Sequence, residues 1–155
     1  MEIMLAELKD DKEINDLFEA AKKFMNQTNV YQWTPTYPTI QIVRQDIYAQ
    51  HLYKLVADHT IVAVATVERK AQDSYVLRRI ATNPNYLSNG YASNLLNDII
   101  NNIKEKNGKH IYSSTSHSNV KMQHFFKKHG FEKISEYIEI EREHLGSFYT
   151  YLKKI

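Results

Sequence analysis

The sequence predicts an α/β fold in which one sheet carries helices on both of its faces. Apolar residues change several times along the chain between short continuous runs, typical of buried strands, and three- and four-residue steps, typical of helices. The resulting order of elements is β, α, α, three β, α, β, α, two β. The 155 residues show no internal repeat or linker, so we expect a single domain over residues 1–155.

The first elements are a strand and a helix. Residues 2–8 contain an apolar stretch suited to a short strand, and Asp10 or Asp11 then caps a helix, with Glu13 placed as in a capping box. The helix is predicted to end within residues 26–29. Its buried face is formed by Ile14, Leu17, Phe18, Ala21, Phe24 and Met25, which recur at three- and four-residue steps.

An aromatic loop and a second helix follow. Two prolines within residues 31–38 exclude a regular helix there. Thr39 can cap the next helix, which places Ile40, Val43 and Ile47 on one side.

The remaining elements follow from the same patterns. Residues 52–57 and 61–67 read as two strands around a turn, and residues 75–82 as a third strand after a polar link. Further predicted elements are helices at 90–106 and 119–129, a strand at 109–115, and a closing pair of strands at 132–141 and 148–152.

Composition narrows the classes of function. The chain is 43% hydrophobic and 25% charged with a formal net charge of +2, and no basic run indicates nucleic-acid binding. It contains no cysteine, hence no thiolate nucleophile. With no apolar run long enough to cross a bilayer and no secretion signal, we expect a cytoplasmic protein without membrane or nucleic-acid partners, as monomer or homodimer.

The most informative segment lies between the strand at 75–82 and the helix that follows it. Residues 80–92 run from the strand through a tight polar turn to a helix start that carries Gly90 and Ala92. A helix start offers unpaired backbone N–H groups, and glycine lets a ligand approach them closely. This arrangement is suited to holding a pyrophosphate, although an ordinary strand-to-helix turn can also use glycine.

A second fragment, residues 119–131, lies one strand downstream. The two fragments, in this order and spacing, resemble the GNAT superfamily of N-acetyltransferases, in its small bacterial form. The resemblance covers residues 52–131 well. It implies a mixed, mostly antiparallel sheet of about seven strands, with a splayed parallel pair that receives acetyl-CoA. The family's phosphate loop, Arg/Gln-x-x-Gly-x-Gly/Ala, matches residues 87–92, with Leu87 in place of the leading polar residue.

The resemblance also implies which residues contact the cofactor. Main-chain groups of the strand would pair with the pantetheine amides, residues 88–93 would surround the pyrophosphate, and Asn119 would lie against the cofactor arm. The implied set is Ile80, Ala81, Thr82, Leu87, Ser88, Asn89, Gly90, Tyr91, Ala92, Ser93, Asn119 and Phe126. Phe126 falls where many members carry a tyrosine that protonates the departing thiolate, so water or Tyr112 would have to substitute.

The acceptor amine needs a base, since a lysine-like amine is mostly protonated at neutral pH. Glu68 and His117 are the candidates, with Asp73 as a third option. Alternatively, Glu68 is a solvated carboxylate and His117 an ordinary loop residue. Trp33 and Tyr37 line the acceptor pocket by the resemblance, or else pack as a hydrophobic loop.

Two functions therefore remain open at the level of the sequence. One is an N-acetyltransferase that moves the acetyl group of acetyl-CoA to a primary amine. The other is a catalytically weak regulatory module of the same fold that binds acyl-CoA. Seven histidines show no metal-ligand spacing, so we expect no metal.

Overall fold

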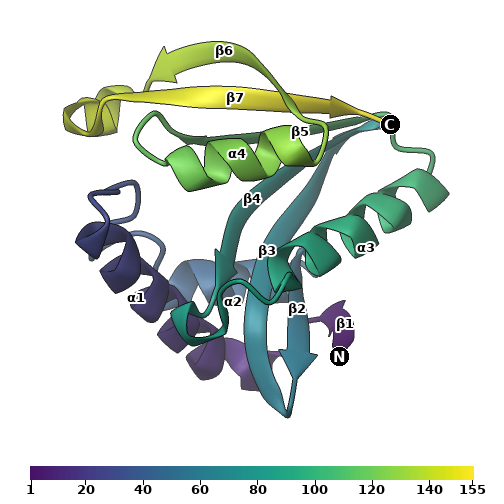
Figure 1. Ribbon diagram of the computed structural model, residues 1–155. Coiled ribbons are helices and arrows are strands. Elements are labelled where there is room, and N and C mark those ends of the chain that lie inside the picture. The colour runs from purple at the N-terminus through teal and green to yellow at the C-terminus, as the bar shows by residue number, and fades with distance from the viewer.

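The computed structural model describes residues 1–155 as one seven-stranded sheet with helices on both faces (Figure 1). The strands are β1 (Glu2–Leu5), β2 (Leu52–Ala57), β3 (Thr60–Ala71), β4 (Ser74–Thr82), β5 (His110–Ser116), β6 (Glu132–Ile138) and β7 (Ser147–Lys154). Their order is β1-β2-β3-β4-β5-β7-β6, and β4 and β5 form the one parallel pair. The predicted fold class is confirmed.

Four α-helices pack on this sheet: α1 (Asp11–Gln27), α2 (Ile40–Tyr48), α3 (Tyr91–Glu105) and α4 (Val120–Lys128). The buried faces of α1 and α2 form one apolar core with the sheet, while α3 and α4 contribute to a second core. Short 3-10 turns at Leu8–Asp10, Pro84–Tyr86 and Ile140–Leu145 complete the chain. No helix is long and apolar enough to cross a membrane.

The expected capping box at the start of α1 is wrong. Asp10 Oδ2 instead accepts hydrogen bonds from the Glu7 amide (2.8 Å) and from Lys54 Nζ (2.7 Å). Glu13 Oε2 accepts from the Ile61 amide at 2.8 Å, so it reaches across to β3. Both carboxylates connect the start of α1 to the sheet, because Lys54 lies in β2 and Ile61 lies in β3.

Several element bounds differ from those predicted. β3 continues to Ala71, so most of the expected polar link is strand, because it pairs with the start of β4 in a tight hairpin. The first strand ends at Leu5, and a 3-10 turn fills the space between β6 and β7. Thr39 does cap α2, with its side chain accepting from the Ile42 amide.

The aromatic loop before α2 is anchored to α1. Lys22, 5% exposed, donates from Nζ to the Pro38 carbonyl at 2.7 Å and pairs with Glu19 at 2.8 Å. Trp33 is buried against Phe18, their rings meeting edge to face with centroids 5.4 Å apart. The loop is thereby held across the sheet where β4 and β5 diverge.

Candidate functional site

The parallel strands β4 and β5 pair over only three residues each and then separate. Ser74, Tyr75 and Val76 lie opposite His110, Ile111 and Tyr112, and no pair follows. We call the point of separation the fork. At the fork, Ser113 Oγ donates a hydrogen bond to the Leu77 carbonyl at 2.7 Å. Because β4 has no strand partner on this side past the fork, its later backbone groups are free to bind a ligand.

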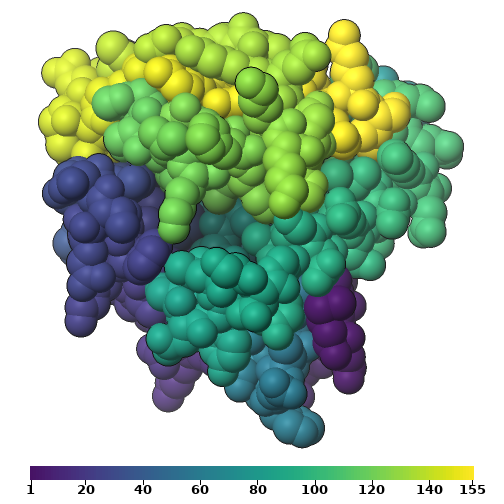
Figure 2. All heavy atoms as spheres, viewed as in Figure 1, coloured from purple at the N-terminus to yellow at the C-terminus, as the bar shows by residue number.

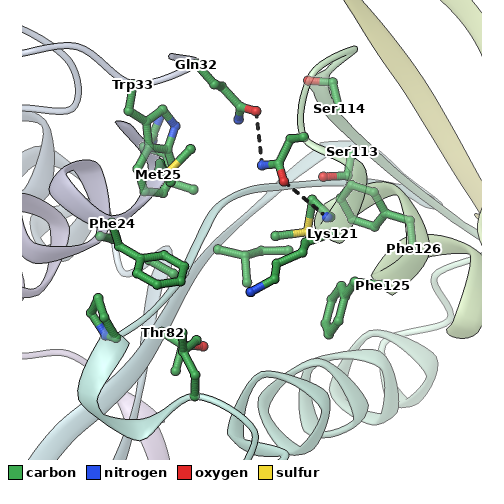
Figure 3. Close-up of a pocket in the computed structure, with 18 residues that line it drawn as sticks. Phe24, Met25, Gln32, Trp33, Thr82, Ser113, Ser114, Lys121, Phe125 and Phe126 are labelled. Atoms are coloured by element: carbon green, nitrogen blue, oxygen red, sulfur yellow. Dashed lines mark hydrogen bonds between the residues drawn. The ribbon is translucent and has the colours of Figure 1, made fainter. Parts of the chain in front are cut away.

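A cavity of about 230 Å³ occupies the opening between the separated strands (Figure 3). Its wall is formed by α1, β4, β5, α4 and the aromatic loop. Figure 2 shows its mouth as a recess between α1, α4 and the teal segment that precedes α3. The lining residues are Ala21, Phe24, Met25, Gln32, Trp33, Arg79, Ile80, Ala81, Thr82, Pro84, Leu87, Ser113, Ser114, Asn119, Lys121, Met122, Phe125 and Phe126.

The loop from β4 to α3 presents backbone donors. Gly90 precedes the helix with φ of +75°, and a Cβ added there would meet nothing within 4 Å. The amides of Tyr91, Ala92 and Ser93 donate to no group of the chain. These free N–H groups, together with the positive end of the helix dipole, make the start of α3 suited to an anion.

Ser93 also links α3 to the end of α4. Its Oγ lies 2.9 Å from Nε2 of His129, which follows the last residue of α4. Burial lowers the pKa of His129, and the charges of Lys128 and Lys153 lower it further. The neutral imidazole is therefore the favoured form at this junction.

A second cavity of about 370 Å³ lies on the other side of the fork. Its lining residues are Gln32, Trp33, Tyr37, Val76, Leu77, Arg78, Arg79, Tyr112, Ser113, Ser114, Tyr137, Glu139, Arg142, Phe148 and Thr150. Five of these residues also line the first cavity, namely Gln32, Trp33, Arg79, Ser113 and Ser114. The two cavities therefore meet at a shared wall where β4 and β5 diverge.

Arg79 forms part of that shared wall. It has φ of +51° at a register shift between β3 and β4. Its guanidinium donates to Asp46 Oδ2 at 2.7 Å and to the Tyr37 hydroxyl at 3.0 Å. Burial opposes its charge, but Tyr37 and Asp46 raise the pKa of Arg79 overall. This buried ion pair ties α2 and the aromatic loop to the bulge in β4.

Gln32 joins the aromatic loop to the end of β5. Its Oε1 accepts from Thr115 Oγ1 and from the Ser116 amide, both at 2.9 Å, and from Asn119 Nδ2 at 3.5 Å. A backbone amide can only donate, so these contacts fix the amide orientation and leave Nε2 without a partner in the chain. Gln32 and Asn119 both line the first cavity, and Figure 3 shows the side chain of Gln32 at its edge.

Arg142 closes the far side of the second cavity. Its Nε donates to Glu139 Oε2 at 2.7 Å and its Nη1 to the Gln32 carbonyl at 3.1 Å. The guanidinium carbon lies 5.2 Å and 5.0 Å from the ring centres of Tyr37 and Phe148. The hydrogen bond to Glu139 is the main influence that raises the pKa of Arg142, and burial opposes it.

The sequence of this chain is similar to that of a known protein family. Residues 14–131 match the sequence model of the Acetyltransferase (GNAT) family, which is more than half of the chain. The chain belongs to the GNAT acetyltransferase family. No functionally curated protein sequence matches it.

Solved GNAT structures share the fold over nearly the whole chain. An acetyltransferase of Streptococcus agalactiae is 22% identical with a TM-score of 0.86, covering 99% of this chain and 95% of that one. The PaiA N-acetyltransferase of Thermoplasma acidophilum, solved with coenzyme A, is 16% identical with a TM-score of 0.83, covering 99% and 98%. A Staphylococcus aureus protein described as a putative acetyltransferase is 24% identical with a TM-score of 0.73, covering 99% of each chain.

Most cofactor residues expected from the GNAT resemblance lie around the first cavity. Ile80, Ala81, Thr82, Leu87, Asn119 and Phe126 line it, residues 88–90 form the adjoining loop, and residues 91–93 form the first turn of α3. Trp33 lines both cavities and Tyr37 lines the second. These cofactor and acceptor assignments stay predictions, now with a consistent location.

The two expected bases are not brought to either cavity. Glu68 lies within β3 rather than near its end, and Arg78 Nη2 and Lys70 Nζ approach it at 2.6 Å and 3.3 Å. Burial acts to raise its pKa, but the hydrogen bond to Lys70 and the charges of Lys70 and Arg78 lower the pKa of Glu68 overall. His117 is exposed beside Gly146, and Asp73 lies in the β3–β4 turn. None of the three lines a cavity.

Sequence reasoning missed five polar residues at or beside the site, namely Gln32, Asp46, Arg79, Glu139 and Arg142. Gln32 and Arg142 are 110 residues apart in sequence, so no local pattern connects them. The sequence did contain a signal for Arg79. Arg78 and Arg79 are consecutive in an apolar strand, where neighbouring side chains point to opposite faces, so one of them must be buried or the strand must contain a bulge. No three His, Asp or Glu side chains come together as a metal site would require.

Proposed function

We propose that this GNAT protein transfers the acetyl group of acetyl-CoA to a primary amine that enters from the opposite side of the sheet. The observation that carries the proposal is the shared wall, where five residues face both cavities. A direct transfer needs two ligands that enter separately and meet with their reacting atoms in contact. Two cavities that join at the fork between β4 and β5 provide that meeting point.

The first cavity is the proposed site of the acetyl-CoA arm. The cosubstrate supplies an activated acetyl thioester, whose thiol is a good leaving group near neutral pH. Unpaired backbone groups of β4 past the fork would bind the amides of the arm, and the free amides of Tyr91, Ala92 and Ser93 would bind its pyrophosphate. Phe24, Phe125 and Met122 give the cavity apolar walls that exclude water.

Glu139 is the proposed base for the acceptor amine. It is the one carboxylate that lines the second cavity, and Arg142 occupies its Oε2. No group of the chain is bonded to Oε1, which is therefore free to take a proton from an incoming ammonium group. This assignment replaces Glu68 and His117, which lie outside both cavities.

Phe126 favours the second candidate function, a module that binds acyl-CoA with little turnover. Its ring lines the first cavity but carries no proton donor for the leaving thiolate. Protonation by water meets this objection, because a thiolate needs little assistance to leave.

Release of free thiol from acetyl-CoA, measured with a panel of amines, separates the two functions. The transferase proposal predicts thiol release that depends on an amine and matches the amount of N-acetylated product. Tight binding of acetyl-CoA with no amine-dependent release from any acceptor would support the binding module instead.

A further inference from the structure

The second cavity is basic on its inner surface. Three arginines line it, Arg78, Arg79 and Arg142, against the single carboxylate of Glu139. Two of the three have partners outside the lining, since Arg78 pairs with Glu68 and Arg79 with Asp46. A ligand in this cavity therefore meets guanidinium groups first, with the balancing carboxylates behind them.

Of these guanidiniums, Arg78 and Arg142 keep free donors, and Arg142 is the more firmly held of the two. Arg79 has every nitrogen engaged, through Nε and Nη2 to Asp46 and Nη1 to Tyr37. Arg142 uses Nε and Nη1, and its Nη2 has no partner in the chain. The only buried side-chain polar atom without a partner is Nε of Arg78, so Nη2 of Arg142 is open to solvent.

The same arginine is also held rigidly. The rings of Tyr37 and Phe148 pack around its guanidinium, while Glu139 and the Gln32 carbonyl bind two of its nitrogens. Its side chain is 24% exposed, so one edge is available and the rest is enclosed. A planar guanidinium fixed in this way with one free edge is the arrangement that proteins use to bind carboxylates.

We propose that the acceptor is an amino-acid-type amine, whose carboxylate binds Nη2 of Arg142 while its amine faces Glu139 and the shared wall. The inference rests on the proposed function, because it names the acceptor class for the same second cavity. A carboxylate satisfies the free guanidinium edge, and the ammonium group finds the one lining carboxylate. A polyamine would instead place a second positive charge among three arginines, which costs energy by like-charge repulsion.

Matched acceptors test the proposal. L-Methionine, L-leucine and L-lysine are each compared with their primary amides and with spermidine, by kcat/KM at a saturating acetyl-CoA concentration. The free acids should exceed their amides by about tenfold or more, as expected for a hydrogen bond between charged groups. The amide also represents a peptide N-terminus, which carries no nearby carboxylate.

Arg142→Gln should remove this preference. The KM of the acids should rise by about tenfold or more, whereas the KM values of the amides and of acetyl-CoA should change by less than about twofold. Arg44→Gln is the matched control, because Arg44 also pairs with a carboxylate, Asp11, but lines neither cavity. Melting temperatures identify a folding defect, and Arg142→Lys, which keeps the charge without the planar edge, should recover only part of the acid preference.

The outcomes distinguish this inference from the transferase proposal. Preference for amides or spermidine would overturn the inference and leave amine acetylation intact. If no acceptor is acetylated, calorimetric titration of the same acids into the protein saturated with coenzyme A decides the matter. Binding that Arg142→Gln abolishes would support the anion site without a transferase, and no binding of any acid would overturn it.

Discussion

Among single residues, acetyl transfer depends most on the carboxylate that receives the proton of the amine. Glu139→Gln keeps the size of the side chain and its ability to accept from Arg142, but removes the basic oxygen. We expect kcat to fall by about a hundredfold or more, with little change in affinity for acetyl-CoA. Steady-state kinetics over a range of pH measure this effect.

Glu136→Gln is the matched control for that measurement, since Glu136 lies on the neighbouring strand β6 and lines neither cavity. Glu68→Gln should also leave kcat near the wild-type value, because Glu68 is occupied by Arg78 and Lys70. A Glu68→Gln variant that lost activity while Glu139→Gln kept it would return the role of base to the residue indicated by the sequence.

Phe126 provides a second prediction at this scale. Phe126→Tyr adds a hydroxyl to a ring that borders the first cavity and packs on Phe131 and Tyr151, at centroid distances of 5.2 Å and 4.9 Å. If the added hydroxyl reaches the cavity, the acetylation rate should rise about threefold to tenfold through proton donation to the thiolate. A slower variant with a lower melting temperature would show that the ring edge faces the core instead.

Among the elements, the start of α3 is the proposed binding site for the pyrophosphate of acetyl-CoA. Gly90→Asn suits the positive φ, which asparagine tolerates, yet fills the empty space above the free amides. The dissociation constant of acetyl-CoA should rise by about tenfold or more, which is the effect of blocking a close backbone approach. Gly130→Asn, at a similar φ of +83° but beyond the end of α4 rather than at the start of α3, should leave it unchanged. Equal affinities for wild type and Gly90→Asn would mean that the pyrophosphate binds elsewhere.

The junction of α3 and α4 predicts a dependence on pH. The pKa of His129 is lowered in the folded protein by burial and by Lys128 and Lys153, so the unfolded chain binds more protons. Its contribution to stability is therefore present above the unfolded pKa of about 6.5 and is lost as the pH falls below it. The interval from about pH 7.5 to about pH 5 brackets the pKa of an unfolded histidine. Over this interval the melting temperature of His129→Gln should fall less than that of the wild type. His124→Gln, an exposed histidine on the same helix, serves as the control and should follow the wild-type curve.

The elements also show what sequence alone can predict. Helices α1 and α3 follow from apolar residues at three- and four-residue steps, because each buries one continuous face. The turn from β4 to the start of α3 was predictable because its strand, loop and helix are consecutive in the chain. The second cavity was not, since Tyr37, Arg79 and Arg142 come from separate elements and meet only through tertiary packing.

In the molecule as a whole, the two cavities lie where the neighbouring strands β4 and β5 separate. β4 and β5 stay paired at one end and diverge toward the other (Figure 1), where the two cavities lie. Because the strands are fixed by cores on both faces, the fork is a preformed feature that needs no large movement to admit a ligand.

Binding of acetyl-CoA should therefore stabilise the whole fold. A ligand that binds only the folded state adds RT ln(1 + [L]/Kd) to the free energy of unfolding, about 2.7 kcal/mol at a hundredfold excess over Kd. Thermal melting with acetyl-CoA should show a higher transition temperature, and acetate at the same concentration should not. An unchanged curve at millimolar acetyl-CoA would contradict the placement of the cosubstrate.

If the protein transfers acetyl groups, free thiol and N-acetylated product must form together. The protein is incubated with acetyl-CoA and the panel of acids, amides and spermidine, and both the free thiol and the N-acetylated product are quantified. We expect equal amounts of the two, formed only when an amine is present and reduced about a hundredfold or more by Glu139→Gln. Thiol release that is independent of every amine, or none despite bound acetyl-CoA, would contradict it.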